Sequence, residues 1–183
     1  MEEATIVLIN DLQHRKPAAC QRLLTEYGPA VFRMVQRIVT CREDAEEVYQ
    51  DVFVKALRGI GGYNPQQASL ATWINRIAYH ESLNFVRGKK PNIVYMDDRD
   101  LGSATLDDAL NDAPRNEETI QQLEQALSML PPHEQAIVSM FYYDNMSLAD
   151  IAFVTGSNPS TVGSQLSRIR KKLYRIIKKR SEQ

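Results

Sequence analysis

The chain has 183 residues, 43% hydrophobic and 25% charged, which suits one medium or two small domains of an ordinary globular protein. Its formal net charge of −1 excludes a uniformly basic nucleic-acid-binding protein, so any such function must rest on unevenly distributed charge. Its two cysteines, Cys20 and Cys41, form no CxxC pair or Cys/His cluster, so we expect buried, reduced thiols rather than a disulfide framework or a zinc site.

The first 41 residues carry a helical pattern without a targeting signal. They begin with acids and a short apolar run, unlike a signal peptide, and no stretch of the sequence approaches the length of a membrane span. We therefore expect a cytoplasmic protein without membrane insertion. Apolar residues recur every three or four positions from Ile6 to Cys41, with breaks at Pro17 and at Gly28-Pro29, which predicts three packed helical segments.

Residues 44–60 predict a helix with one buried face and one acidic face. The inward stripe contains Ala45, Val48, Val52, Phe53, Ala56, Leu57 and Ile60. The outer face carries Glu46, Glu47, Gln50 and Asp51. The helix macrodipole favours anions near a helix start, which accounts for these acids structurally, and the alternative is a docking face for a protein partner.

Glycines and a proline between residues 59 and 65 end that helix, and a loop over residues 63–69 leads into a second helix, residues 70–90. Its buried stripe is predicted to contain Leu70, Trp73, Ile74, Ile77, Ala78, Leu83 and Val86. Its other face offers amides, rings and cations, namely Asn75, Arg76, Tyr79, His80, Asn84, Arg87, Lys89 and Lys90. Single-stranded or distorted DNA is bound by side chains that stack on bases and contact phosphates, and this face offers both kinds. The alternative is a core helix whose other face is simply solvated.

An Asp-rich run over residues 95–115 follows and predicts a flexible linker, since it lacks the ligand pattern of an EF-hand calcium loop. Apolar periodicity resumes near Asn116, with helices expected around residues 120–130 and 134–143, and a helical hairpin follows. We therefore predict an all-α fold with a first helical domain at residues 1–94, an acidic linker at 95–115, and a four-helix domain at 116–183.

The hairpin over residues 147–172 has the pattern of a DNA reader. Ser147 can cap its first helix, Gly156 can end it with a positive φ, and Pro159 suits the first position of the next helix. In that second helix an apolar stripe faces the core, which leaves small polar residues outward near its start and cations near its end. A recognition helix in the major groove needs this arrangement, although an ordinary helical hairpin fits the geometry equally well.

The C-terminal tail favours the DNA interpretation. Between residues 160 and 183 the cations Arg168, Arg170, Lys171, Lys172, Arg175, Lys178, Lys179 and Arg180 face the single acid Glu182.

Neither of two other functional classes fits the whole chain. The three histidines, His14, His80 and His133, do not form an HExxH motif, and a Gly-rich phosphate loop and a nucleophile elbow are both missing from the sequence. We therefore predict no catalytic residue, no metal site, no cofactor and no enzymatic activity. A stand-alone helix-turn-helix repressor or activator is the stronger alternative, but it leaves the aromatic and amide-rich helix over residues 73–90 without a task.

Five fragments in order resemble the extracytoplasmic-function (ECF) type sigma factors of bacterial RNA polymerase. Residues 44–53, DAEEVYQDVF, resemble the family's DAEDxxQExF, and residues 72–78, TWINRIA, resemble TWLxxIA. Residues 130–132, 147–152 and 160–173 resemble LPxxxR, SxxEIA and GTVKSRLxRARxxL. The resemblance covers nearly the whole chain and implies that it directs promoter-specific transcription initiation.

The resemblance also implies partners and site residues. Core RNA polymerase would be bound through its β′ clamp and β flap, with Asp44, Glu46, Glu47, Gln50 and Asp51 on the β′ clamp. The unwound minus-10 strand, with a flipped base, would be held by Tyr63, Asn64, Ser69, Trp73, Arg76, Tyr79, His80, Asn84 and Arg87. The minus-35 element would be read by Ser160, Thr161, Gly163, Ser164, Gln165, Ser167, Arg168 and Lys171. The acidic linker would thread toward the polymerase active-site channel, and an anti-sigma factor is a possible further partner.

Three residues depart from the family pattern. His80 stands where Asn is usual, which changes the chemistry of a base contact and gives it a pH response. Gly163 and Gln165 stand where Lys or Arg is common. Fewer cations weaken phosphate contact, and Gly163 also costs about 1 kcal/mol of helix propensity, so we expect a weak or context-dependent minus-35 interaction.

Overall fold

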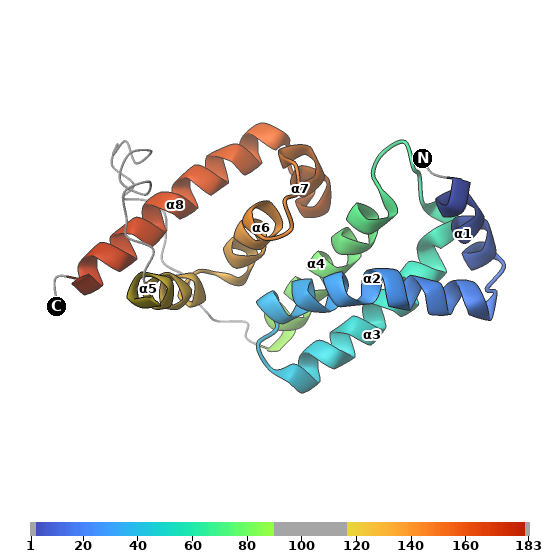
Figure 1. Ribbon diagram of the computed structural model, residues 1–183, viewed down its shortest axis with the longest axis horizontal. Coiled ribbons are helices and arrows are strands. Elements are labelled where there is room, and N and C mark those ends of the chain that lie inside the picture. The colour runs from blue at the N-terminus through green and yellow to red at the C-terminus, as the bar shows by residue number, and fades with distance from the viewer. Residues whose placement is uncertain (1–2, 90–116, 182–183) are drawn as a thin grey trace.

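The computed structural model describes residues 3–89 and 117–181, and within these ranges every regular element is helical, which confirms the all-α prediction (Figure 1). The elements are α1 (Glu3–Gln13), α2 (Pro17–Ile38), α3 (Arg42–Gly59), the short 3₁₀ helix η1 (Ile60–Gly62), α4 (Leu70–Lys89), α5 (Glu117–Ser128), α6 (Pro132–Tyr142), α7 (Leu148–Thr155) and α8 (Pro159–Ser181). The predicted linker over residues 95–115 lies outside the described residues, as do both predicted domain boundaries.

The first helical bundle consists of α1 to α4, with α2, α3 and α4 packed against one another. Its centre is apolar: Val35, Val52 and Ile74 are fully buried, one from each of these three helices. Edge-to-face aromatic contacts extend the core, since Tyr49 lies 5.5 Å from Phe32 and 5.0 Å from Phe53 between ring centroids. Burial of these stripes holds the helices together because non-polar area is removed from water.

Helix α2 continues through Gly28-Pro29, so the predicted break there, and with it the third helical segment, is wrong. Proline removes one backbone donor and crowds the preceding turn, which lowers helix stability. Here Leu23 lies before the proline and Val31 and Met34 after it, all at least 98% buried, so tertiary packing on both sides outweighs the local cost. A Cβ at Gly28 would lie 2.6 Å from the Tyr49 hydroxyl oxygen, so any larger residue there would require the Tyr49 side chain to shift.

The second bundle consists of α5 to α8 and confirms the four-helix prediction. The hairpin caps form as expected. Ser147 Oγ accepts from the Asp150 backbone N–H at 3.1 Å, and Gly156 ends α7 with a φ of 74°. Asn158 Oδ1 accepts from the Thr161 N–H at 2.8 Å and so caps α8.

Both cysteines differ from the expectation of buried thiols. Cys20 is half-buried and Cys41 is exposed, and both are free. Cys41 lies at the start of α3, where its Sγ donates to Glu43 Oε2 at 3.0 Å. A residue at a helix start contributes little to the inward stripe, which explains why the thiol faces solvent.

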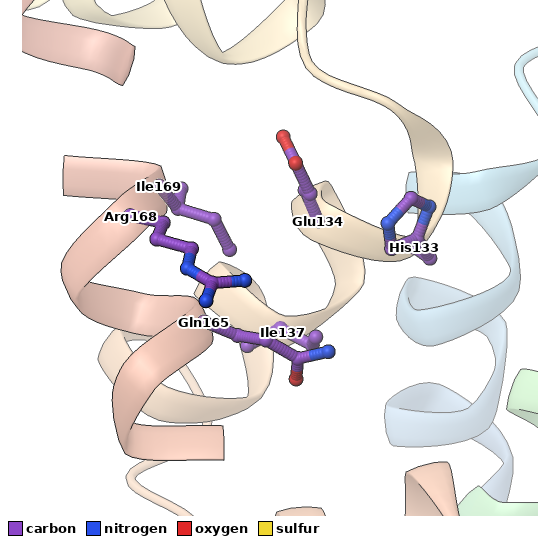
Figure 2. Close-up of a pocket in the computed structure, with 6 residues that line it drawn as sticks. All are labelled: His133, Glu134, Ile137, Gln165, Arg168 and Ile169. Carbon is purple, nitrogen blue, oxygen red and sulfur yellow. The ribbon is translucent and has the colours of Figure 1, made fainter. Parts of the chain in front are cut away.

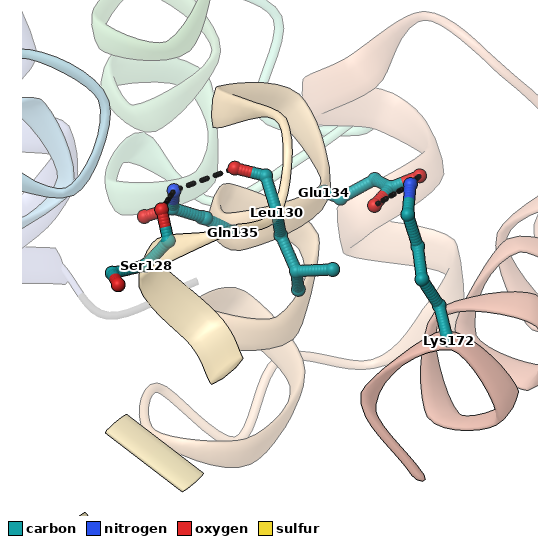
Figure 3. A network of polar contacts seen from close by, with 5 residues as sticks. All are labelled: Ser128, Leu130, Glu134, Gln135 and Lys172. Atoms are coloured by element: carbon teal, nitrogen blue, oxygen red, sulfur yellow. Dashed lines mark hydrogen bonds and ion pairs between the residues drawn. The ribbon is translucent and has the colours of Figure 1, made fainter. Parts of the chain in front are cut away.

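A buried ion pair joins α6 to α8 (Figure 3). Lys172 Nζ lies 3.2 and 3.1 Å from the two carboxylate oxygens of Glu134, and both side chains are nearly excluded from solvent, at 13% and 11% exposed. Next to Glu134, the Gln135 amide donates to the Leu130 carbonyl at 2.7 Å and so ties α6 to the turn that follows α5. These polar contacts help to hold α8 in place within the second bundle.

The two bundles touch one another, with α7 lying along α4 and α6 against α2 (Figure 1). Among the described residues, no helix is both long and apolar enough to cross a membrane.

We expect the Glu134–Lys172 pair to dominate the polar stability of the second bundle. E134A or K172A should each lower the free energy of unfolding by about 3 kcal/mol, because each leaves an uncompensated buried charge. The double variant should lose less than the sum. Urea unfolding of all four proteins measures this cycle.

The exposed pair Arg42–Glu46, with side chains 76% and 52% exposed, is the matched control for this cycle. Its coupling energy should stay within about 0.5 kcal/mol. Equal coupling energies in the two cycles would contradict the prediction.

Candidate nucleic-acid interface

The N-terminal half of α8 presents the face expected of a recognition helix. Val162, Leu166 and Ile169 are at most 3% exposed and attach the helix to its bundle. Small polar and cationic side chains are exposed on the opposite side, namely Ser160, Thr161, Ser164 and Arg168, while Ser167 and Lys171 are half-buried. Short side chains at the first turns allow close approach to base edges, and cations further along can reach phosphate.

Gly163 and Gln165 were both predicted to point outward, but both are half-buried at the edge of this face. A Cβ on Gly163 would lie 3.9 Å from Leu148 Cδ1, so this position faces α7. Gln165 lines a small pocket of about 90 Å³ between α6 and α8, together with His133, Glu134, Ile137, Arg168 and Ile169 (Figure 2). Its Oε1 is buried and has no hydrogen-bond partner among the described residues. Both positions flank the apolar stripe of α8. Because α8 contacts α6 and α7 at these positions, a wider part of its surface is covered than the apolar stripe alone.

The loop before α4 is held by its own polar groups. The Tyr63 hydroxyl donates to the Ala68 carbonyl at 3.0 Å, and Asn64 Oδ1 accepts from the Gln66 N–H at 2.9 Å. Ser69 Oγ accepts from the Thr72 N–H at 3.1 Å and caps α4. Tyr63, Asn64 and Ser69 therefore shape the loop, and Asn64 and Ser69 are also exposed at its surface.

Trp73 lies beside this loop, with its ring 5.5 Å from that of Tyr63 between centroids. It also packs against Gly59, where an added Cβ would lie 3.6 Å from the indole ring. The half-buried indole thus joins the end of α3, the loop and α4 into one surface.

Helix α4 is covered on two sides, and this corrects one predicted contact residue. Leu70, Ile74 and Ala78 face the first bundle as expected. Tyr79 was expected on the polar face but is only 6% exposed, and this burial raises the pKa of its hydroxyl. The second bundle packs against α4 as well. Less of the α4 surface is therefore exposed than expected for a helix that buries only one face. Asn84 and Arg87 remain exposed near its C-terminal end.

Arg76 makes the principal contact between α4 and α7. Its Nη1 donates to the Phe153 carbonyl at 2.7 Å, and its guanidinium lies 4.9 Å from the centroid of the Phe153 ring. One turn earlier, Thr72 Oγ1 donates to Asp150 Oδ1 at 3.2 Å. Phe153 and Asp150 were not predicted as functional residues. The spacing of apolar residues within α7 does not indicate which other helix α7 packs against.

His80 lies one turn beyond Arg76 on the same side of α4. Burial of the ring and the nearby charge of Arg76 lower the pKa of His80 below its ordinary value of 6.5, and Arg87 adds a smaller effect in the same direction. A hydrogen bond with the Val154 backbone and the charge of Glu81 oppose the shift. The lowered pKa favours the neutral imidazole at neutral pH.

The acidic face of α3 is exposed as predicted. Glu46, Glu47, Gln50 and Asp51 all lie at the surface, and Glu46 forms an exposed pair with Arg42 at 3.0 Å. Asp44 differs, because it is half-buried and pairs with Lys89 Nζ at 2.6 Å, which ties α3 to the end of α4. Across residues 3–89 and 117–181, no group of three or more His, Cys, Asp or Glu side chains is placed to hold a metal ion.

Comparisons with known proteins match both halves of the chain to one family. Residues 23–91 match the family model for sigma-70 region 2, and residues 120–173 match the model for sigma-70 region 4. The chain is 25% identical over 178 residues to the RNA polymerase sigma-H factor of Pseudomonas aeruginosa, covering 93% of this chain and 92% of the relative. It is 27% identical over 161 residues to the ECF RNA polymerase sigma factor SigM of Mycobacterium tuberculosis, covering 87% and 77%.

Two solved structures share the fold. The sigma factor RpoE, crystallised with the anti-sigma factor NepR from Bartonella quintana, superposes with a TM-score of 0.62 at 20% identity, covering 86% of this chain and 96% of that one. CnrH in complex with the cytosolic domain of CnrY superposes with a TM-score of 0.66 at 17% identity, covering 94% and 96%.

The lowered pKa of His80 predicts a pH-dependent contribution to stability. A histidine whose pKa is lower in the folded state contributes stability that is present above 6.5 and is lost as the pH falls through the folded-state value. The unfolding free energy of the native protein, minus that of H80N, should therefore fall on acidification below pH 6.5. Urea unfolding at a series of pH values measures this difference.

An NMR titration tests the same point directly. The ring resonances that disappear in H80N identify His80, and their midpoint should lie below 6.5. A titration midpoint at or above 6.5 would contradict the lowered pKa of His80.

Proposed function

Because the chain belongs to the ECF-type sigma factors of the sigma-70 family, we propose how its described surfaces share the work of initiation. As a sigma factor, it binds core RNA polymerase and directs it to promoter DNA. Such a factor acts by binding and positioning, while bond formation belongs to the polymerase, so we expect no enzymatic activity of its own. Because it acts on RNA polymerase, we place its action in the cytoplasm.

One observation carries the proposal. Rings, amides and cations at the surface of α4, and small polar and cationic side chains at the surface of α8, occur in a single chain, each within the residues that match the corresponding sigma region. We assign residues 1–94 to polymerase docking and minus-10 melting, residues 95–115 to an acidic linker that threads toward the active-site channel, and residues 116–183 to minus-35 recognition. A stand-alone repressor or activator has no use for the first of these surfaces.

For the minus-10 element, the proposed contact surface runs from the loop at residues 63–69 along α4. Its exposed or half-exposed members are Tyr63, Asn64, Ser69, Trp73, Arg76, His80, Asn84 and Arg87. Rings and guanidinium groups can stack on unpaired bases, and cations can neutralise phosphates, so the separated strand is trapped by binding. Tyr79 supports this surface from beneath, because its ring lies edge-on at 5.3 Å from that of His80.

For the minus-35 element, the proposed contacts come from Ser160, Thr161, Ser164, Ser167, Arg168 and Lys171 on α8. Gly163 and Gln165 are uncharged, so two positions that usually supply cations in the family contribute no charge to the groove. The minus-35 interaction is therefore expected to be the weaker of the two, with a shallow salt dependence.

For the polymerase, the proposed docking face is formed by Glu46, Glu47, Gln50 and Asp51 on α3. The three acids and the Gln50 amide are exposed and close together on one helix, which suits a cationic partner surface such as that expected of the β′ clamp. Asp44 acts from behind this face by holding α3 to α4 through Lys89. An anti-sigma factor is a further partner to be expected, because related sigma factors are found in such complexes.

Transcription with core polymerase tests the function itself. We expect the chain to confer specific initiation on a genomic promoter library in run-off assays, and to bind duplex promoter DNA poorly on its own. A chain that opened no promoter with core enzyme, yet protected a palindromic duplex unaided, would instead be a stand-alone regulator.

Charge reversal on α3 tests the docking face. E47K should weaken binding to core polymerase about tenfold, because it removes an attractive charge and places a like charge at the interface. The matched control is E124K, which makes the same change at an exposed position on α5. Competition with a labelled sigma factor for core enzyme measures both, and equal effects of the two variants would refute the assignment to α3.

A further inference from the structure

The recognition helix carries a buried hydrogen-bond acceptor without a donor. Gln165 Oε1 is excluded from solvent and accepts no hydrogen bond within the part of the chain that the structure describes. A buried acceptor left unpaired lowers the stability of the fold, and an apolar side chain of similar size, such as leucine, avoids that cost. Packing alone therefore does not explain why a glutamine stands at this position.

Gln165 shares its pocket with Arg168, an exposed cation of the recognition face (Figure 2). The pocket lies between α6 and α8 and has a volume of about 90 Å³. The two residues are three positions apart on α8, and helical side chains with this spacing are neighbours. Long side chains on a helix also lean toward its N-terminus, which carries the Arg168 guanidinium toward the turn that holds Gln165.

The carboxylate in the same pocket is already engaged. Both oxygens of Glu134 bind Lys172 Nζ, at 3.2 and 3.1 Å. Ile137 and Ile169 also line the pocket and have no polar side-chain atom. Gln165 Oε1 therefore remains as an unpaired acceptor beside the Arg168 side chain.

An arginine that reads a base needs its guanidinium held in one plane. Bidentate contact with the O6 and N7 atoms of guanine uses two of its five N–H donors and leaves the others available for protein. An exposed arginine samples many rotamers, and fixing one of them reduces the gain from the contact. A glutamine oxygen can accept one of the remaining donors and hold the plane, and unlike a carboxylate it does not repel the phosphates.

We propose that Gln165 is a positioning residue for Arg168: its Oε1 accepts a hydrogen bond from the guanidinium when α8 lies in the major groove, and this sets the base preference of Arg168 at the minus-35 element. The proposal rests on the proposed function, because it assumes that Arg168 contacts that element. A residue that stands in place of a family cation then contributes orientation rather than charge. The minus-35 interaction is weak in phosphate contact but selective at the base that Arg168 reads.

Transcription from a promoter library tests this role with the whole chain and core polymerase. A promoter that the native chain uses is randomised across its minus-35 element, and sequencing of barcoded transcripts gives the preference for each base. R168A should reduce the preference at one position about tenfold, because a bidentate pair is lost. Q165L should reduce it at the same position by about three- to tenfold, and the double variant should lose no more than R168A alone.

A matched control and a stability measurement separate positioning from a structural role. Q122L makes the same change at a half-buried glutamine of α5 in the same bundle and should leave every base preference unchanged. Urea unfolding should show that Q165L is at least as stable as the native chain, because the substitution removes an unpaired buried acceptor.

Q165E gives a second test that does not depend on the folding of Q165L. It retains an oxygen acceptor beside Arg168, so the base preference should persist. Use of all promoters in the library should fall, because the variant adds a negative charge near the phosphates.

Native base preferences in Q165L or in R168A, or loss of the preference in Q165E, would overturn the proposal. So would losses that add in the double variant, or a loss in Q165L that is spread evenly over all positions. In each of these cases the native chain still initiates transcription and the sigma function stands. If the native chain initiates from no promoter, the proposed function fails, and the positioning role fails with it.

Discussion

The relation between the two halves of the molecule depends on the contact of Arg76 with α7. A guanidinium group can donate several hydrogen bonds in a fixed plane and can also lie over an aromatic ring, and Arg76 does both with Phe153. The groups that suit nucleic acid also suit a helix that offers a carbonyl, a ring and a carboxylate. Through these contacts, the packing of α7 on α4 joins the two bundles.

Charge distribution explains how a chain of nearly neutral net charge can serve both polymerase and DNA. Acids are exposed on α3, and cations are concentrated along α8. Where charges enter the interior they are paired, as Glu134 and Lys172 are between α6 and α8, because an unpaired ion there is costly. The exposed charges remain available for partners, whereas the buried pair fixes the orientation of the recognition helix relative to its bundle.

Local signals in the sequence predicted the second bundle well. Ser147, Gly156 and Asn158 adopt the capping roles expected of their types, since caps and a positive φ involve only neighbouring backbone groups. The same reasoning failed at Gly28-Pro29, where local signals predict a break but α2 continues. There the buried residues on both sides of Pro29 belong to a core made by other helices, and no window around the proline contains that information.

The sequence by itself determined the helical class, the buried stripes, the hairpin geometry and the family, because periodicity, capping and motif order are properties of neighbouring residues. It also placed the exposed acids of α3 and the outward start of α8. Only the tertiary structure decided that Tyr79 is buried, that Gln165 faces α6 and that Asp44 pairs with Lys89. It alone brought Arg76 to Phe153, 77 positions apart in the chain. A helical pattern indicates which face is apolar, but the number of neighbours that cover a helix, and which groups they present, depends on long-range packing.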